Sequence, residues 1–117
     1  MEISLFDKNG SAVAYISSDG TIYLWDGRPV AYLLENHVYG FNGKHLGWFE
    51  NGIMYDGDGY RIGFSREKCP VVTQIEPVKS VKHVKSVKSV KSIAPIKPIF
   101  SLANSNKKFK EFLLMGY

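Results

Sequence analysis

The chain has 117 residues, of which 44% are apolar, 14% aromatic and 22% charged, and its formal net charge is +4. This size fits one small soluble domain, and a membrane-spanning helix is excluded because no run approaches the roughly 20 apolar residues that it needs. The opening MEISLFDKNG lacks the apolar stretch of a secretory signal, and the single Cys69 leaves no intramolecular disulfide, so we expect a cytoplasmic protein.

Charge and composition change near residue 70. Residues 1–70 carry six basic and nine acidic side chains, a net charge of −3, whereas residues 71–117 carry nine lysines and two glutamates, a net charge of +7. Such a shift predicts a boundary. We expect a four-hairpin β-repeat domain over residues 1–70, an extended arm rich in lysine, valine, serine and proline over residues 71–103, and a short amphipathic helix over residues 104–117.

The first 64 residues contain four copies of one unit, each with a β-branched start, a turn glycine, an aliphatic residue, a small residue and an aromatic residue. The aromatic residues are 17, 16 and 16 positions apart. The last three columns are Val13, Val30, Leu46 and Ile62; Ala14, Ala31, Gly47 and Gly63; and Tyr15, Tyr32, Trp48 and Phe64. Five matched columns in four copies indicate an internal repeat.

Each unit is typical of a β-hairpin, because short β-branched and aromatic runs flank a dipeptide that tolerates positive φ. These dipeptides are Asn9-Gly10, Asp26-Gly27, Asn42-Gly43 and Asp58-Gly59. Further turn signals separate the units. The sequence therefore predicts an all-β fold of eight short strands in an antiparallel meander.

One hairpin is marginally stable in water, so the four hairpins must share a core. Closure about a pseudo-fourfold axis limits exposed edges, and an ordinary eight-stranded barrel or a sandwich is the alternative. Strict alternation places the aliphatic and aromatic columns on one face and the small column on the other. We therefore expect Tyr15, Tyr32, Trp48 and Phe64 to pack together around the axis as a structural aromatic ring, with the small column where backbones crowd.

The four hairpins, which end in Val-Ala-Tyr, Val-Ala-Tyr, Leu-Gly-Trp and Ile-Gly-Phe, resemble a small bacterial domain family, the 4-fold beta flower. The resemblance covers residues 1–70 and implies a fold, but it carries over no active site. In the fourth copy Asp56 stands where Phe6, Trp25 and Phe41 stand in the others. This departure predicts either broken symmetry or a notch.

Residues 78–98 repeat a triplet, mostly Val-Lys-Ser, seven times. Only a threefold backbone such as polyproline II keeps all valines on one side and all lysines on another. A flexible, solvated tract is one interpretation. The other is a docked arm that packs its valines on the domain or on a neighbouring subunit.

The end of the chain is the one helical candidate. Phe109, Phe112 and Leu113 share a face at helical spacing, and residues 104–106 offer a cap. About ten residues are too few for a stable lone helix, so this segment must dock on the protein itself or on another copy.

No catalytic, cofactor-binding or metal-binding constellation is present in the sequence. The Asp56–Gly59 run lacks the later ligands of a calcium loop, and we interpret it as a turn. His37 and His45 lie beside turns, where Asp56 or Glu35 are potential neighbours, and they have no zinc-like spacing. Cys69 has no activating base in the sequence around it.

We therefore expect a non-enzymatic binding or assembly module, without a cofactor, whose tail docks on a partner protein or on another subunit of a homo-oligomer. The alternative is binding of nucleic acid or an anionic surface through the lysine tract. Its candidate anion-binding residues are Lys79, Lys82, Lys85, Lys88 and Lys91.

Overall fold

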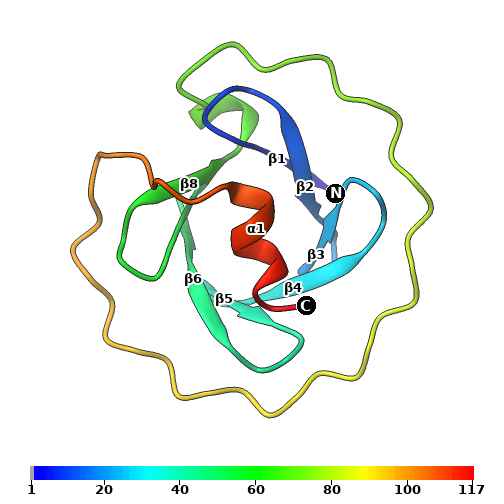
Figure 1. Ribbon diagram of the computed structural model, residues 1–117, viewed down its shortest axis with the longest axis vertical. Helices are drawn as coiled ribbons and strands as arrows, with labels where there is room; N and C mark the ends of the chain where they lie inside the picture. Colours follow the sequence, from blue (N-terminus) through cyan, green and yellow to red (C-terminus); the bar gives the residue numbers. More distant parts are fainter. Residues whose placement is uncertain (1) are drawn as a thin grey trace.

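The computed structural model describes residues 2–117. Its strands are β1 (Ile3–Phe6), β2 (Ala12–Ile16), β3 (Thr21–Leu24), β4 (Pro29–Leu34), β5 (His37–Gly40), β6 (His45–Glu50), β7 (Ile53–Tyr55) and β8 (Arg61–Phe64). Each strand pairs antiparallel with the next, and β8 returns to β1 through Phe64 and Phe6 to close a barrel (Figure 1). The predicted closed set of four hairpins is confirmed. A short 3-10 turn, η1 (Arg66–Lys68), and one helix, α1 (Phe109–Leu114), follow the strands.

The four hairpin turns have the same backbone hydrogen bond, which defines equivalent positions. The N–H of each turn glycine donates to the carbonyl three residues earlier, on Asp7, Leu24, Gly40 and Asp56. Asp56 is therefore equivalent to Asp7, and the prediction of a missing aromatic residue is wrong. The aromatic column one residue earlier is complete and buried: Phe6, Tyr23, Tyr39 and Tyr55.

Asp56 belongs to its turn and opens no notch. Its carboxylate accepts backbone N–H groups of Asp58 and Tyr60 at 2.9 and 3.0 Å, and the hydroxyl of Ser105 at 2.7 Å. The side chain is 1% exposed. These contacts fit the turn interpretation of this acidic run.

A β-bulge occurs at the same place in every hairpin. The register shifts between β1 and β2, β3 and β4, β5 and β6, and β7 and β8. The residue without a partner is each time the aliphatic one of the repeat: Val13, Val30, Leu46 and Ile62. A bulge breaks strict alternation and re-aims side chains. The aliphatic and small columns consequently share the inner face, and the aromatic column lies on the outer face.

The small column leaves room inside the barrel for the apolar side chains of α1, and the helix itself lies over one end of the barrel (Figure 1). Phe109, Phe112 and Leu113 are at most 3% exposed and join the aliphatic core. A Cβ atom at Gly63 would lie 2.4 Å from the Phe109 ring, and one at Gly47 would lie 3.2 Å from the Phe112 ring. The helix thus docks on its own barrel. It is shorter than the predicted segment, because it begins at Phe109 after Lys108, which makes no side-chain cap.

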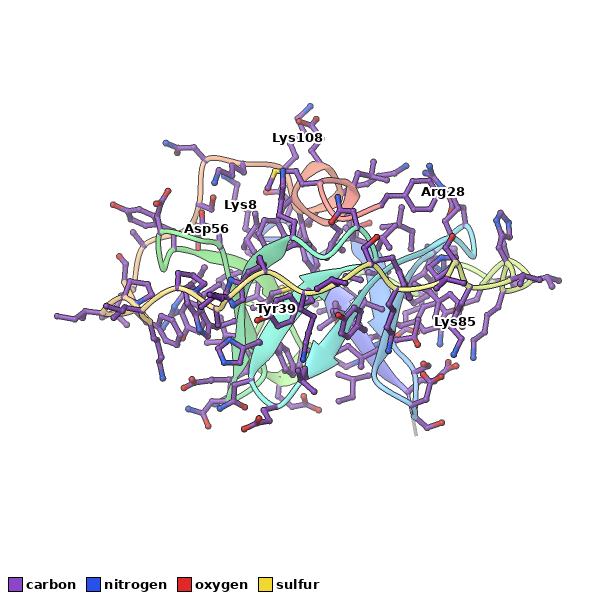
Figure 2. The ribbon with its side chains drawn as sticks, turned by 90° about the horizontal axis from the view of Figure 1, so that it is seen from below. Lys8, Arg28, Tyr39, Asp56, Lys85 and Lys108 are labelled. Carbon is purple, nitrogen blue, oxygen red and sulfur yellow. The ribbon has the colours of Figure 1, made fainter. Side chains whose placement is uncertain are left out.

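The arm encircles the barrel. Residues 73–101 contain no helix or strand, and they run around the outside of the barrel in Figure 1 and across the middle of its wall in Figure 2. The molecule is a disc with extents of 37 × 36 × 23 Å. The arm therefore forms the circumference of the disc, and α1 lies on one flat face.

Candidate interaction surface

The arm presents a row of exposed aliphatic side chains to the outside. Every third residue of the segment belongs to it, and each is 83–96% exposed. We call this row the apolar rim: Val72, Ile75, Val78, Val81, Val84, Val87, Val90, Ile93, Ile96, Ile99 and Leu102. An exposed apolar surface of this extent is typical of an interaction site.

A second row, one residue later in each triplet, faces the aromatic residues on the outer barrel wall. Tyr15 stacks on Tyr23 with 5.5 Å between ring centroids, and the Lys79 ammonium lies 4.5 Å from the Tyr15 centroid. Nine residues further on, Lys88 lies 4.1 Å from the centroid of Tyr32. Such cation–π contacts are individually weak, but they recur here at the period of the repeat.

The next barrel groove receives an aromatic ring from the arm. Phe100 stacks on Tyr55 with centroids 3.8 Å apart and 9° between the ring planes, and it lies 6.1 Å from Trp48. Lys97, again nine residues after Lys88, has its ammonium 4.8 Å from the centroid of the Phe100 ring. Successive parts of the arm therefore contact the rings of successive pairs of neighbouring hairpins, in the order in which both occur along the chain.

Carboxylates on the barrel hold the same row of lysines. Glu2 contacts Lys79 at 2.7 Å and Lys82 at 3.0 Å, and Asp19 contacts Lys85 at 2.7 Å. Hydrogen bonds from Lys79 and Lys82 lower the pKa of Glu2, and the hydrogen bond from Lys85 lowers the pKa of Asp19. These pairs are partly exposed, so each adds little alone, but together they orient the lysines toward the barrel.

The third row of the arm binds the hairpin turns through its backbone. The N–H groups of Gln74, His83, Ser92 and Ser101 donate to the carbonyls of Gly10, Gly27, Gly43 and Gly59 at 2.8–2.9 Å. These donors are nine residues apart, which is three triplets per hairpin. The indole of Trp25 adds a hydrogen bond to the Pro77 carbonyl at 2.9 Å.

The length of the arm matches the circumference. From Gln74 to Ser101 there are 27 residues, which at about 3.1 Å each extend about 84 Å. Three quarters of a circle 36 Å across measure about 85 Å. A nine-residue period in a threefold backbone therefore fits a barrel of four hairpins.

The turn glycines let the arm approach closely. Gly43 has φ of 87°, and a Cβ atom there would lie 2.2 Å from the Val90 carbonyl oxygen. At Gly27 the corresponding distance to the Val81 carbonyl oxygen is 2.1 Å. No other residue type satisfies both the backbone conformation and the close contact.

The sequence model of the 4-fold beta flower protein family matches residues 3–113. The chain belongs to the 4-fold beta flower family. The match extends past residue 70, where the sequence predicted that it would stop, and takes in the arm and most of α1. No curated protein and no solved structure gives a significant match to this chain.

The beta flower places the four predicted ring residues apart from one another. Tyr15, Tyr32, Trp48 and Phe64 are each at most 6% exposed, but they lie on the outer wall, and none belongs to the cluster that fills the barrel. The expectation that they meet around the axis is wrong. The bulge is the reason, because it puts the aliphatic residue and the small residue on the same face.

The arm is docked with the reverse of one predicted orientation, in which its valines would pack on the barrel. The valines face outward, and the lysines face the barrel, where rings and carboxylates bind ammonium groups. Four of the five candidate anion-binding lysines lie over tyrosine rings, namely Lys79, Lys82, Lys88 and Lys91, and the fifth, Lys85, pairs with Asp19. Binding of nucleic acid through them would require these contacts to break.

Two histidines that the sequence left without a role form a pair under the arm. The Nδ1 atom of His37 is 2.9 Å from the Nε2 atom of His45, and neither predicted neighbour, Asp56 or Glu35, is the partner. Burial, reinforced by His37, lowers the pKa of His45 to about 4. The His45 ring packs edge-on against Trp48. His37 and His45 are eight residues apart on the two strands of one hairpin, β5 and β6, and this spacing is the sequence feature that could have predicted the contact.

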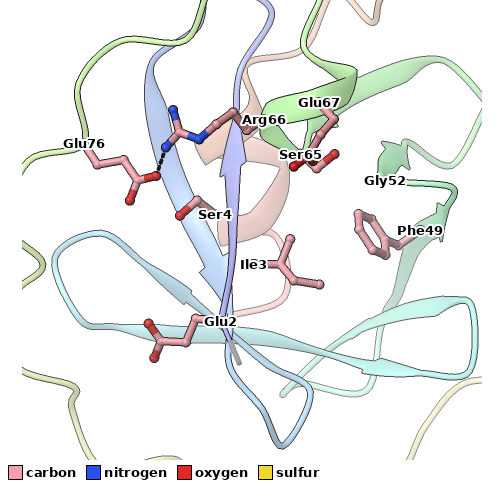
Figure 3. A pocket seen from close by; sticks show the side chains of 9 residues that line it. All are labelled: Glu2, Ile3, Ser4, Phe49, Gly52, Ser65, Arg66, Glu67 and Glu76. Carbon is pink, nitrogen blue, oxygen red and sulfur yellow. Dashed lines mark hydrogen bonds and ion pairs between the residues drawn. The ribbon is translucent and has the colours of Figure 1, made fainter.

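A cavity of about 510 Å³ lies where β1 and β8 separate beyond their single residue pair (Figure 3). It is lined by Glu2, Ile3, Ser4, Phe49, Gly52, Ser65, Arg66, Glu67 and Glu76. Arg66 is already paired with Glu76 across it. Cys69, near the start of the arm, is half-buried, and its thiol lies 3.5 Å from the Asp7 carbonyl oxygen.

Within residues 2–117, no helix is long and apolar enough to cross a bilayer. The same residues contain no group of three or more histidine, cysteine, aspartate or glutamate side chains positioned to hold a metal ion.

Proposed function

We propose that this beta flower is a non-enzymatic assembly module whose apolar rim associates with the rim of a second copy. The observation that supports this is the exposure of eleven aliphatic side chains, 83–96% each, on one continuous edge. Burying such side chains favours association by about 25 cal/mol per Å² of apolar surface, before the entropic cost of association is subtracted. The lysine contacts and the backbone hydrogen bonds of the arm hold the rim in place before it binds.

The chemistry of the rim favours another copy as its partner. The rim is convex, uncharged and repeats the same side chains along its length, so a second rim offers the same chemistry, and an isologous contact between the two is self-complementary. The apolar rim is one extended chain, and the edges of two discs curve away from each other, so a single contact buries less than the roughly 800 Å² per partner of a standard interface. We therefore expect weak contacts at several places along the rim.

Light scattering coupled to size-exclusion chromatography tests this proposal over a range of protein concentrations. We expect the mean mass to rise with concentration. The triple variant Val84→Ser, Val87→Ser and Val90→Ser removes the centre of the rim and should remain monomeric at concentrations where the natural chain associates.

The matched control is Ser80→Ala, Ser86→Ala and Ser89→Ala. It changes three exposed residues of the same arm and keeps the rim and every backbone N–H group. Association should be unchanged. A natural chain that is monomeric up to its solubility limit would contradict self-association. The partner would then be a different protein with an apolar surface, and an experiment that captures proteins on the immobilised chain would test for it.

A further inference from the structure

A second cavity, of about 540 Å³, lies on the flat face of the disc beside α1, away from the apolar rim. The first hairpin turn forms one side of it, and the segment that leads into α1 forms the other. Its charged lining residues are Asp7, Lys8, Arg61, Lys107, Lys108 and Lys110. Its volume is in the range of small-molecule sites.

The lining is strongly basic. It contains five cationic side chains and one carboxylate, Asp7, which accepts the backbone N–H groups of Asn9 and Ser11 at 3.0 Å. Lys8 and Lys108 lie on the same side of the molecule in Figure 2. Among residues 2–117, four of these cations form no ion pair with a carboxylate: Lys8, Arg61, Lys107 and Lys110. This differs from the arm, where carboxylates hold the lysines.

Arg61 is the most constrained of these groups. Its backbone N–H donates to the Ala103 carbonyl at 3.1 Å, and its carbonyl accepts from Ser105, so the residue is fixed between β8 and the chain before α1. Its Nε–H is buried and has no hydrogen-bond partner within residues 2–117. By contrast, Arg28 pairs with Asp26 and Arg66 with Glu76. A buried guanidinium donor without a partner is expected to be satisfied by a ligand or by water.

We propose that this cavity binds a small polyanion with two or more adjacent phosphoryl groups. Arg61 offers a planar set of donors, which suits a phosphoryl group. The lysines lie around it on two separate chain segments, so they can neutralise further charges of an extended anion. A single monovalent anion would leave most of these cations unpaired.

Isothermal titration calorimetry with inorganic tripolyphosphate tests the site. We expect saturable binding with one site per chain. The variant Lys107→Ala and Lys110→Ala should weaken it at least tenfold, and Arg61→Gln should do the same. Because Arg61 lies in a strand, circular dichroism checks the fold of that variant, and the double lysine variant changes only exposed side chains.

The matched control is Lys44→Ala and Lys68→Ala, which removes the same charge from lysines outside the cavity. If the control weakens binding as much as the cavity variant, the binding is general charge attraction and the proposal is wrong. Co-sedimentation with phosphatidylcholine vesicles, with and without phosphatidylinositol 4,5-bisphosphate, whose headgroup carries two adjacent phosphoryl groups, separates a lipid headgroup from a free phosphate compound. Binding to the bisphosphate vesicles that depends on the same residues supports the site with a lipid source. Absence of binding to both probes overturns the proposal.

Discussion

At the scale of single residues, the turn glycines have two functions. Each adopts positive φ to close its hairpin, and each lets a carbonyl of the arm approach its Cα atom. Gly20, in a turn between hairpins, shares the first property with φ of 87°, but a Cβ atom there would meet only the Leu33 carbonyl at an ordinary 3.4 Å. A comparison of Gly20 with the glycines of the hairpin turns therefore distinguishes the effect of backbone strain from the effect of arm docking.

We predict that Gly43→Ala detaches the arm locally and Gly20→Ala does not. Both substitutions pay roughly 1–2 kcal/mol of left-handed strain, but only Gly43→Ala also places a methyl group against the Val90 carbonyl. Limited trypsin digestion should therefore cut faster after Lys88 and Lys91 in Gly43→Ala alone. Equal cleavage rates in the two variants would contradict the close contact.

The histidine pair gives a second prediction at this scale. The pKa of His45 is lowered to about 4 from 6.5. As the pH falls, the unfolded chain therefore binds a proton at His45 at a higher pH than the folded chain does. The folded state is favoured above pH 6.5, and this contribution is lost as the pH falls from 6.5 toward 4.

Chemical denaturation at several pH values measures this effect. Stability of the natural chain should decline between pH 6.5 and pH 4, and His45→Gln should flatten that part of the curve. His83→Gln, which removes an exposed histidine of the arm, is the control for the loss of an imidazole. An identical slope in His45→Gln would show that His45 protonates equally easily in both states.

At the scale of elements, the barrel and its helix depend on each other. Four bulges direct the aliphatic residues inward, four small residues leave space beside them, and α1 fills that space. A six-residue helix has no stability of its own in water. The packing of its apolar side chains into the barrel therefore stabilises both the helix and the barrel.

We predict that Phe112→Ala destabilises the protein by about 3–5 kcal/mol, since Phe112 is 1% exposed and contacts the inner face at Gly47. Glu111→Ala, on the solvent side of the same helix, should change stability by less than about 0.5 kcal/mol. Urea unfolding measures both. A small effect of Phe112→Ala would show that the barrel core is complete without the helix.

At the scale of the whole molecule, two periods fit each other. The barrel repeats about every 16 residues, the arm repeats every three, and nine arm residues span one hairpin. This match converts a low-complexity segment into the edge of a disc, with lysines inside and aliphatic side chains outside. The self-association proposed for the rim and the polyanion site proposed beside α1 occupy different surfaces of that disc.

The sequence by itself determined the hairpins, the closed barrel, the family and the three-residue period of the arm. These features depend on local signals: a dipeptide at each turn, a β-branched run beside it, and a repeat that can be counted. The basic lining of the cavity beside α1 was not predicted, because Lys8, Arg61 and Lys107 are far apart in the chain.

Only the tertiary structure decided which face each column occupies. A bulge shifts one residue per hairpin, and a one-residue shift moves a side chain to the other face of a strand. Alternation alone therefore placed Tyr15, Tyr32, Trp48 and Phe64 inside the barrel, whereas the bulge places them outside. The orientation of the arm follows from this, because lysines bind a wall of rings and carboxylates that only the bulged barrel presents.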